Sequence, residues 1–273
     1  IDGQDVIVGG EDFTVKGGSP NAAGLRKSVY TEDLAVKHKF PLVRLHEGGG
    51  GSVAGPSKEK KGYGGDPVFA RSRFKSVAQT LKEVPVVSAA LGPVAGLPAS
   101  RFVGSHFRIM VKDNAQILVA GPAVVSRAFG KDFTKEELGG SDVHKKNGVT
   151  DNIAESEEDA FNQIKKFLSF FPANIYELPP KKDSKDETGR SEKILEEIIP
   201  KDRKKTYEMR EIINLVVDDK DFFERSNFFG RGIITGFARL NGFSVGIFAN
   251  DSNFYAGSMT VSYTHLRAHE TRP

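Results

Sequence analysis

Apolar and polar positions follow two different periods over the first half of the chain. Runs rich in valine, isoleucine and leucine, bounded by glycine or proline, predict strands. Between them, Leu25–Lys39 and Phe69–Lys82 carry apolar residues at a spacing compatible with helices. The predicted strands are Val6–Val8, Phe13–Val15, Leu42–Leu45, Val84–Leu91, Phe107–Val111 and Gln116–Val119. Strands that alternate with helices favour an α/β layer architecture in which most strands are buried.

The clearest helix is predicted over Ser156–Phe171. Ser156 can cap its first turn, and the acidic residues that follow suit the positive end of a helix. Pro172 is expected to end it. One apolar stripe, which we assign to the core rather than to a ligand site, comprises Phe161, Ile164, Phe167, Leu168 and Phe171.

The pattern changes over residues 181–205, where 16 of 25 residues are charged. Such a segment cannot bury enough apolar surface to fold alone, so we expect a linker that lies over the surface. It would separate one lobe, residues 1–180, from the start of a second lobe, residues 206–260. The elements predicted in the second lobe are a helix over 208–218 and strands over Ile233–Leu240 and Val245–Ala249.

Two segments from opposite ends of the chain align without gaps. Gly3–Ser19 matches Gly242–Ser258 at five positions. The identical pairs are Gly3 and Gly242, Val6 and Val245, Asp12 and Asp251, Gly18 and Gly257, and Ser19 and Ser258. Both copies are expected to run strand, turn, strand and Gly-Ser, so we interpret them as an internal duplication. The second lobe is expected to be incomplete because the chain stops soon after its copy.

The two ends of the chain are set apart from this pattern. The first residue is Ile1 rather than methionine, which we interpret as a sign of an internal piece of a longer protein. Residues 261–273 fit neither copy of the duplication and resemble translated adapter sequence, so we interpret them as a non-native tail. His265 and His269 have the spacing of a metal-binding pair, but no third ligand is near in sequence, so no metal site is predicted.

The composition is that of a globular protein whose default partner is neither a nucleic acid nor a membrane. Thirty-nine basic and 36 acidic residues leave a net charge of +3. No apolar run reaches the length of roughly 18 residues that a membrane-spanning helix needs. The absence of cysteine excludes disulfides, thiolate metal sites and cysteine nucleophiles. Glycine is abundant, at 29 of 273 residues, and indicates tight turns or close approaches between backbone and ligand.

Two glycine-rich turns are candidates for binding chemistry. Gly48–Gly51 follows a predicted buried strand, where backbone N–H groups can approach a ligand; a flexible turn is the alternative. Gly92–Pro98 follows the most apolar predicted strand and is expected to turn into a helix, which would aim free N–H groups at one spot. Two such donors can hold a developing oxyanion, and close packing of strand against helix is the alternative. Neither turn has the spacing of a nucleotide-phosphate loop.

Side chains that could act as a catalytic base are few. No G-x-S-x-G or H-E-x-x-H motif is present. We interpret His38, His46 and His106 as polar surface or edge residues, and retain His144 as a candidate because glycines flank its segment. A site without an obvious base suits chemistry in which backbone dipoles stabilise an enolate and the cofactor or co-substrate handles the proton.

Several motifs in a fixed order resemble one family. They are DFTVKGGS (12–19), DLAVK (33–37), GPVAGLPAS (92–100), AGPAVV (120–125), EELGGSDVH (136–144), NGVTD (147–151), IIP (198–200), YEMREIINLVVDDKDFFE (207–224) and ITGFARLNGFSVGIFAN (234–250). Over about residues 1–260, the chain resembles the β-subunits of biotin-dependent acyl-CoA carboxylases and the related decarboxylase subunits. The carboxylases of this family act on propionyl-CoA, acetyl-CoA or methylcrotonyl-CoA.

The resemblance implies two crotonase-like lobes, each a spiral of ββα units. It implies that the N-terminal lobe binds acyl-CoA and that the C-terminal lobe binds carboxybiotin, which a biotin carboxylase or biotin-carrier partner supplies. The active site would lie between two subunits of a homo-oligomer. A ligase-class carboxyltransferase of this kind moves the carboxyl group from biotin to the α-carbon of the thioester. Because the biotin side would lie beyond this chain, the chain alone is expected to be inactive.

The resemblance also assigns site residues. A Gly-Gly pair of the family donates two amides to the thioester enolate, and the matching positions are Gly96 and Leu97. The family's D-G-A-G-A-R run is Glu47–Ser52 here and lacks the arginine. Lys27 matches a family lysine expected near the CoA phosphates. The other residues expected to bind substrate are Gly48, Gly49, Gly50, Gly51, Gly121, Pro122, Gly139 and Gly140.

Leu97 is the departure with the largest consequence. Leucine retains the backbone N–H but cannot adopt the φ > 0 conformations open to glycine, and Pro98 restricts the turn further. The change to leucine has three alternative consequences, which are a narrowed acyl pocket, an altered substrate or lost activity. The preferred function is the acyl-CoA-binding half of a carboxylase. The alternatives are the carboxyltransferase subunit of a decarboxylase and a non-catalytic acyl-CoA-binding relative, and bacterial cytosol and mitochondrial matrix fit equally.

Overall fold

The computed structural model divides into two compact units, which are described separately. It describes residues 1–19, 22–49, 73–184, 186–187, 189–202 and 204–258. The first unit comprises Ile1–Leu168 and Pro172–Glu177, and the second comprises Ser169–Phe171 and the residues from Leu178 onward. The candidate site lies in the first unit.

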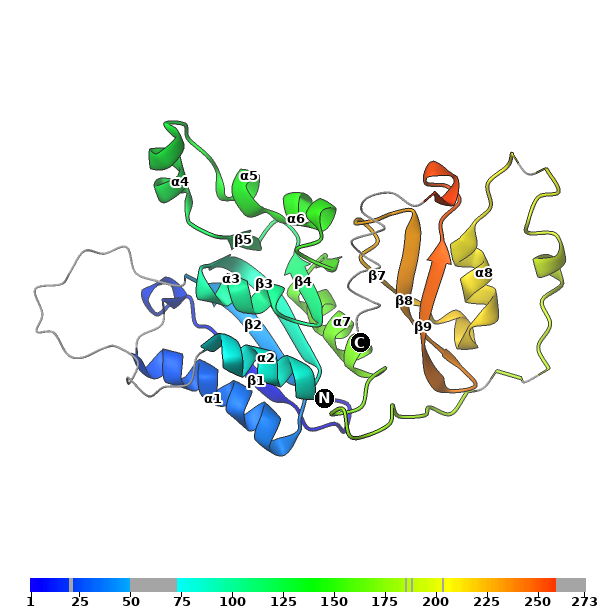
Figure 1. Cartoon of the computed structure of the whole chain (residues 1–273), viewed down its shortest axis with the longest axis horizontal. Coiled ribbons are helices and arrows are strands. Elements are labelled where there is room, and N and C mark those ends of the chain that lie inside the picture. The colour runs from blue at the N-terminus through cyan, green and yellow to red at the C-terminus, as the bar shows by residue number, and fades with distance from the viewer. Residues whose placement is uncertain (20–21, 50–72, 185, 188, 203, 259–273) are drawn as a thin grey trace, which may run out of the picture. The chain divides into compact units, whose positions relative to one another are not determined.

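The first unit is built on a parallel sheet, in which the strands follow the order β1-β2-β3-β4-β6 and β5 pairs with β3 (Figure 1). The strands are β1 (Ile7–Gly10), β2 (Leu42–Gly48), β3 (Val86–Ala95), β4 (Phe107–Val111), β5 (Gln116–Leu118) and β6 (Asn152–Ala154). The helices are α1 (Ala22–His38), α2 (Arg73–Glu83), α3 (Leu97–Val103), α4 (Pro122–Phe129), α5 (Lys135–Gly139), α6 (Ser141–Asn147) and α7 (Glu157–Leu168). The predicted α/β architecture is therefore confirmed.

The central strands are buried because helices cover them. α1 packs against β1, β2 and α2, while α7 packs against β4 and β6. Strands covered in this way read as nearly continuous apolar runs, as β3 and β4 do. One core cluster combines Ala35 of α1 with Leu42, Val84 and Val86. The three strand ends Gly10, Gly48 and Ala95 lie at one edge of the sheet, because parallel strands share their carboxyl edge.

Strand β3 is longer than the sequence predicts. The predicted strand over Val84–Leu91 stops where Gly92 and Pro93 suggest a turn, but β3 continues to Ala95. Its second half has a separate partner, because Pro93–Ala95 pairs with β5. The helix that follows begins at Leu97, so the bend lies at Gly96 rather than at the Gly-Pro pair.

The strand predicted over Phe13–Val15 is wrong, because these residues form a turn. The carboxylate of Asp12 accepts hydrogen bonds from the Thr14 N–H (2.9 Å) and hydroxyl (2.6 Å). The chain then enters the 3-10 turn η1 (Lys16–Gly18), in which all three residues have positive φ. Local side-chain hydrogen bonding therefore overrides the strand propensity of the apolar residues.

Helix α7 begins as predicted and ends early. The Ser156 hydroxyl accepts the Asp159 N–H at 3.1 Å, so the predicted cap is confirmed. Ile164, Phe167 and Leu168 are each 2% exposed, and Phe167 stacks on Phe107 with ring centroids 4.6 Å apart. Phe171 lies beyond the helix and belongs to the second unit, and Phe161 is 37% exposed, so the predicted stripe is shorter at both ends.

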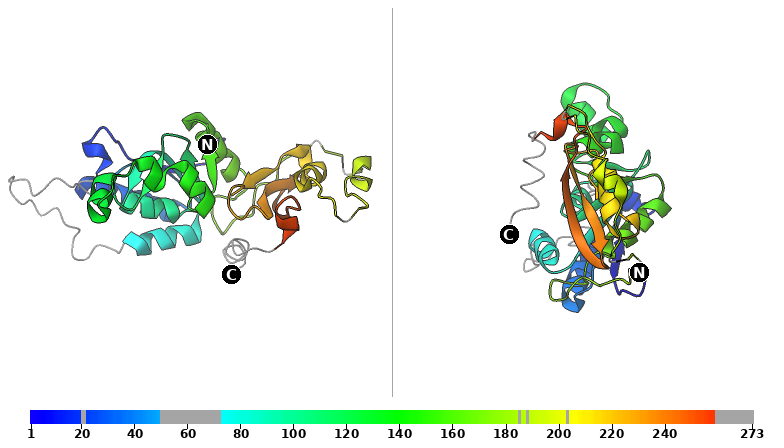
Figure 2. Two further views of the ribbon diagram at one scale, coloured as in Figure 1. Left: turned by 90° about the horizontal axis from the view of Figure 1, so that it is seen from above. Right: turned by 90° about the vertical axis from the view of Figure 1, so that its right-hand side faces the viewer.

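The second unit is a three-stranded antiparallel sheet with helix α8 (Met209–Val216) against one face (Figure 2). Its strands are β7 (Phe223–Arg225), β8 (Ile233–Leu240) and β9 (Phe243–Asn250). Ile213 and Val217 pack against Ile234 and Ala238 to form its core. The predicted strand Ile233–Leu240 matches β8, and the helix predicted over 208–218 is two residues too long at its C-terminal end and one at its N-terminal end.

The charged segment predicted as a linker has little regular structure. Its described residues contain one 3-10 turn, Lys193–Glu196. Arg190 ties the segment to the end of α8, because its guanidinium donates to the carbonyls of Leu215 (2.7 Å) and Val217 (3.0 Å). The limits at residues 180, 205 and 260 stay predictions, and the proposed tail lies outside the described residues.

The two copies of the proposed duplication adopt the same backbone turn. Residues 16–18 have φ values of 55°, 63° and 71°, and residues 255–257 have φ values of 49°, 52° and 72°. Asp12 accepts the N–H of Thr14 at 2.9 Å, and Asp251 accepts the N–H of Asn253 at 3.0 Å. Each copy therefore has the predicted strand and turn, while the second predicted strand is absent from these two described segments. The matching hydrogen bonds support the duplication.

Candidate active site

A cavity of about 530 Å³ opens in the first unit. Its wall combines the end of β1, the η1 turn, one face of α1, two residues of β2 and the start of α3. The lining residues are Val8–Asp12, Val15, Gly18, Ser19, Gly24, Lys27, Ser28, Thr31, Arg44, His46, Leu97, Pro98 and Arg101. The cavity thus brings together three segments that are separate in the sequence. They are Gly18 and Ser19, Lys27, and Leu97 and Pro98.

Close packing of two glycines fixes one side of this cavity. A Cβ on Gly48 would lie 2.7 Å from the Cα of Gly18, so only glycine allows the η1 turn to approach the end of β2. The N–H of Gly49 donates to the carbonyl of Gly17 at 3.0 Å and holds the turn in place. Gly48 therefore has a packing role, whereas Gly49 contributes a backbone hydrogen bond and has room for a side chain. Gly50 and Gly51 lie outside the described residues.

The bend between β3 and α3 depends on Gly96. Gly96 has φ 71° and ψ −129°, a conformation that glycine alone adopts readily. Leu97 is the first helical residue, is not among the described residues with positive φ, and precedes Pro98, a residue that is common in the first turn of a helix. The conformational conflict expected at Leu97 is therefore absent, because the residue with positive φ is Gly96.

The amides at the bend differ in whether the backbone supplies an acceptor. The Gly96 N–H donates to the carbonyl of Leu118 at 3.3 Å, as part of the pairing between β3 and β5. The expectation of a free Gly96 amide is therefore not met. The first intrahelical bond of α3 runs from the Ser100 N–H to the Gly96 carbonyl. The N–H groups of Leu97 and Ala99 precede it and have no intrahelical acceptor, whereas Pro98 has no N–H.

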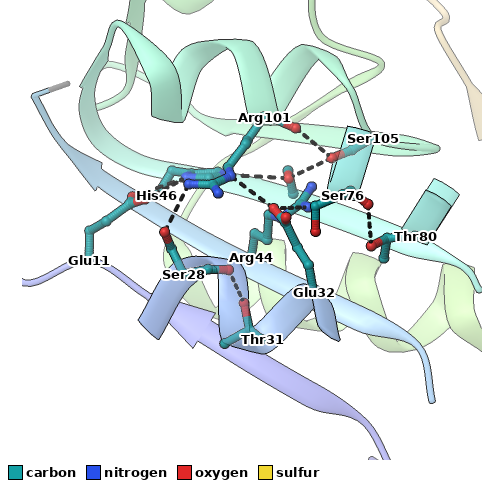
Figure 3. Close-up of polar contacts among 11 residues, drawn as sticks. Glu11, Ser28, Thr31, Glu32, Arg44, His46, Ser76, Thr80, Arg101 and Ser105 are labelled. Atoms are coloured by element: carbon teal, nitrogen blue, oxygen red, sulfur yellow. Dashed lines mark hydrogen bonds and ion pairs between the residues drawn. The ribbon is translucent and has the colours of Figure 1, made fainter. Parts of the chain in front are cut away.

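A buried ionic cluster lies beside the cavity (Figure 3). The Oε1 atom of Glu32 accepts hydrogen bonds from Arg44 Nη2 and Arg101 Nε, both at 2.9 Å. Arg101 Nη1 also donates to the Ser28 hydroxyl at 3.0 Å. Burial lowers the pKa of Arg44 to about 10, an effect that Glu32 opposes and the neighbouring Arg101 reinforces. The sequence analysis missed this cluster, although an arginine within the apolar run of β2 is a signal that could have drawn attention to it.

His46 is not a surface or edge residue as predicted, because its side chain is only 2% exposed. Its Nδ1 atom lies 3.0 Å from one carboxylate oxygen of Glu11, and that oxygen also accepts the Glu47 N–H at 3.1 Å. Burial raises the pKa of Glu11, but the interactions with His46 and the Glu47 amide outweigh it and leave that pKa below its ordinary value. The pair therefore fixes the end of β2 to the end of β1.

Glu11, His46 and a serine are arranged in the order found in hydrolase triads. His46 Nε2 lies 3.3 Å from the Ser88 hydroxyl, which contacts the Ser105 hydroxyl at 2.7 Å. Ser88 is fully buried and is not a lining residue of the cavity. A nucleophile must reach its substrate, so this arrangement is structural.

The remaining predicted site residues lie away from the cavity wall. Gly121 and Pro122 begin α4. Gly139 ends α5, where a Cβ would overlap the Ile117 carbonyl, and Gly140 forms a bridge with Gln116. His144 has a structural role, because its Nε2 atom lies 2.8 Å from the Ile117 carbonyl oxygen and Asn147 donates to its Nδ1 atom at 3.2 Å.

The described residues offer neither a metal cluster nor a membrane-spanning helix. The described residues contain no group of three or more histidine and acidic side chains placed to hold a metal ion. None of the helices in the described ranges is long and apolar enough to cross a membrane. His265 and His269 lie outside these ranges.

Comparison with known proteins gives relatives over almost the whole chain. The α subunit of methylmalonyl-CoA decarboxylase from Veillonella parvula is 34% identical over 263 residues, which are 96% of this chain and 50% of the relative. The propionyl-CoA carboxylase β chain from Roseobacter denitrificans is 32% identical over 273 residues, which are 100% of this chain and 52% of the relative. The chain therefore spans about half the length of these curated relatives.

Solved structures agree with the sequence relatives. Transcarboxylase 12S, described as a hexamer assembly with hydrolysed methylmalonyl-coenzyme A bound, is similar with a TM-score of 0.80 and 28% identity over 94% of this chain and 50% of that chain. A single-chain, multi-domain long-chain acyl-CoA carboxylase is similar with a TM-score of 0.79 and 25% identity over 94% of this chain and 24% of that chain. The resemblance to acyl-CoA carboxylase β-subunits is confirmed. A family model described as the carboxyl transferase domain matches residues 1–270, and the chain belongs to that family.

Proposed function

We propose that the chain is the acyl-CoA-binding half of a biotin-dependent carboxyltransferase. One observation carries the proposal: the η1 turn, Lys27 and the start of α3 line a single cavity at the carboxyl edge of the sheet. Ligands of open α/β sheets bind at this edge. Lys27 is exposed on α1, where an ammonium group can meet the phosphates of CoA. The helix start at Leu97, which lines the same cavity, would then lie beside the acyl thioester.

The chemistry requires an enolate. Loss of a proton from the α-carbon places negative charge on the thioester oxygen, and backbone N–H groups aimed at that oxygen lower the barrier. Since the Gly96 amide is bonded to Leu118, we assign one donor to the N–H group of Leu97, which lines the cavity. Carboxybiotin on a partner chain would supply the carboxyl group. Its nitrogen–carboxyl bond would break as the bond to the α-carbon forms, and the biotin nitrogen would take up the α-proton. The spiral arrangement of ββα units, the homo-oligomer and a cytoplasmic or mitochondrial-matrix location are parts of the same proposal.

Two alternatives differ in their consequences. Relatives named as carboxylase and as decarboxylase are similarly identical to the chain, so the transfer could run from biotin to the thioester or in reverse. A non-catalytic acyl-CoA-binding protein is favoured by one observation, the hydrogen bond that occupies the Gly96 amide. This alternative predicts that acyl-CoA binds but that no carboxyl group is transferred.

The test is carboxyl transfer by the full-length protein and its Leu97→Pro variant. Proline is tolerated at the first position of a helix but has no N–H, so the variant loses one donor with little change to α3. Transfer of labelled carboxyl from carboxybiotin to propionyl-CoA is expected to fall about 100-fold to 1,000-fold. Leu97→Ala keeps the N–H and is the matched control, for which near-parental turnover is expected.

Three outcomes of this assay separate the candidates. Turnover by Leu97→Pro within about tenfold of the parent would show that the oxyanion donors lie elsewhere. Binding of propionyl-CoA without any transfer by the parent protein would favour the non-catalytic alternative. Transfer only from a carboxylated acyl-CoA to free biotin carrier would favour the decarboxylase direction.

A further inference from the structure

A continuous chain of hydrogen bonds runs from the end of β1 through His46 to helix α3 (Figure 3). The His46 ring lies 3.0 Å from a Glu11 carboxylate oxygen through Nδ1 and 3.3 Å from the Ser88 hydroxyl through Nε2. The Ser88 hydroxyl lies 2.7 Å from that of Ser105, which donates to the Arg101 carbonyl at 2.9 Å. None of these contacts has a role in the proposed function, although Glu11, His46 and Arg101 line the cavity.

The protons available in this chain determine the direction of each hydrogen bond. A carbonyl oxygen only accepts, so the single proton of the Ser105 hydroxyl is used on Arg101. Ser88 must then donate to Ser105, and its one proton is no longer available to His46. The Nε2 atom of His46 therefore has to donate to Ser88.

The other ring nitrogen of His46 also needs a proton. Nδ1 lies within 3.1 Å of both carboxylate oxygens of Glu11, and one of these oxygens also accepts the Glu47 N–H. Burial raises the pKa of Glu11, but the interactions with His46 and the Glu47 amide outweigh burial and leave that pKa below its ordinary value. Glu11 is thus a carboxylate at neutral pH and can only accept, so Nδ1 donates to it.

A ring with one proton would break the chain at its far end. Nδ1 would keep the proton for Glu11, and Nε2 would accept from Ser88. The Ser88 oxygen would then accept from Ser105, and the Arg101 carbonyl would lose its donor. Because all four contacts are present together, only a doubly protonated ring satisfies them.

The charged groups around His46 suit this protonation state. Glu11, which follows β1, contacts the ring directly. Arg44 of β2 and Arg101 of α3 both donate to the carboxylate of Glu32 on α1, at 2.9 Å, and the neighbour on β3 is an uncharged serine. The charge in direct contact with the ring is therefore negative and favours an imidazolium.

The last contact of the chain is with helix α3, which runs from Leu97 to Val103. The Arg101 carbonyl lies in the last turn of α3, where carbonyls need a donor from outside the helix. A helix of seven residues is marginal by itself, so contacts of this kind help to fix its position. Leu97 lies at the other end of α3 and carries the N–H assigned to the thioester oxygen. A shift of α3 would thus displace that N–H.

We propose that His46 carries a proton on each ring nitrogen and acts, through Ser88 and Ser105, as a positioning residue for α3. The doubly protonated ring directs both hydroxyl protons toward α3 and so holds the Leu97 N–H at the thioester oxygen. The positioning role rests on the proposed function, whereas the protonation state does not.

Nitrogen NMR of the histidine rings tests the protonation state. In the 273-residue chain, both His46 nitrogens are expected to carry a proton at neutral pH, and His46→Gln identifies their signals by removing them. Ser105→Ala frees the Ser88 hydroxyl to donate to Nε2, so a singly protonated ring no longer loses a hydrogen bond. The pH at which the ring loses its second proton should then fall by about one unit. Ser105→Thr keeps a hydroxyl and is the matched control, which should retain the parental behaviour.

Carboxyl transfer by the full-length protein tests the positioning role. Ser105→Ala is expected to lower kcat about tenfold while KM for propionyl-CoA stays within about twofold, because the weakened interaction is one made in the transition state. Ser105→Thr should restore kcat.

Each result decides a separate part of the proposal. A single ring proton on His46 in the parent at neutral pH would overturn it without affecting the proposed function, and this measurement does not depend on how a variant folds. An unchanged titration of the ring in Ser105→Ala would overturn the coupling through the two serines, and an unchanged kcat would overturn the positioning role. No transfer by the parent would contradict the proposed function and the positioning role with it, while the NMR result would still decide the protonation state.

Discussion

Glu32 is the residue that joins the two buried arginines beside the cavity. It lies on α1 but bonds to Arg44 of β2 and Arg101 of α3, which are 12 and 69 residues away in sequence. No pattern within α1 marks it as a buried ion-pair residue, because spacing along one helix says nothing about partners brought in by the fold. Local motifs point to Lys27 and Leu97, which line the cavity and whose roles stay predictions. The cluster around Glu32 instead forms only where three separate elements meet.

Replacing Glu32 should therefore be more harmful than replacing one of its partners. Glu32→Met would leave two buried guanidinium groups without the carboxylate that both of them bind, and we expect the free energy of unfolding to fall by about 3–5 kcal/mol. Arg101→Met would leave the Arg44–Glu32 pair balanced and should cost less. Urea denaturation of both variants measures this difference. An equal or reversed order would show that the two arginines are not in charge competition for Glu32.

The ends of a strand could be predicted where a glycine, proline or other local signal ends it. They could not be predicted where pairing with a distant strand extends it. β4 and β8 match their predicted limits. β3 extends past Gly92 and Pro93 because β5 pairs with its second half, and no local sequence signal reports that pairing. The strand predicted over Phe13–Val15 is wrong because of a local contact instead. The carboxylate of the neighbouring Asp12 accepts a backbone N–H there and stabilises a turn.

The hairpin between β8 and β9 shows how one side chain can hold an element. Asn241 and Gly242 have φ values of 51° and 77°, as expected of a two-residue turn between antiparallel strands. The Asp218 carboxylate accepts both of their N–H groups, at 2.9 and 2.7 Å. Burial raises the pKa of Asp218, but these two donors outweigh it and leave the pKa below its ordinary value of 3.8.

The stabilisation that Asp218 provides should depend on pH. A carboxyl whose pKa is lower in the folded protein stabilises it above pH 3.8, and loses that effect as the pH falls through the folded value. The parent is therefore expected to resist urea better than Asp218→Asn at pH 7. The difference should shrink in acid, near pH 3. A difference in urea midpoint that stays constant between these two pH values would contradict the assignment.

At the scale of the whole molecule, the sequence predicts the family and the duplication better than it predicts the site. The alignment of Gly3–Ser19 with Gly242–Ser258 needs only a gapless comparison, and the turns at residues 16–18 and 255–257 match it in backbone conformation. The amide at Gly96 could not be placed in the same way. Its direction depends on Leu118, a residue of another strand.

Equivalent glycines in the two copies should respond differently to alanine. Gly18 and Gly257 have φ values of 71° and 72°, so alanine should cost about 1–2 kcal/mol at either position. At Gly18 the new Cβ would also overlap the backbone of Gly48, whereas at Gly257 its nearest neighbour is the Asn250 Cβ at 3.4 Å. Thermal denaturation should thus show the larger loss for Gly18→Ala. Equal losses would mean that the first turn can move away from β2.

The turn that the two copies share has different neighbours in each. A Cβ on Gly257 would meet only Asn250 and Asp251, which belong to its own stretch of chain. A Cβ on Gly18 would instead overlap the backbone of Glu47 and Gly48 at the end of β2. Because Gly18 lines the cavity, any displacement of the first turn relative to β2 would change the shape of the cavity, whereas the same displacement in the second copy would leave it unaffected.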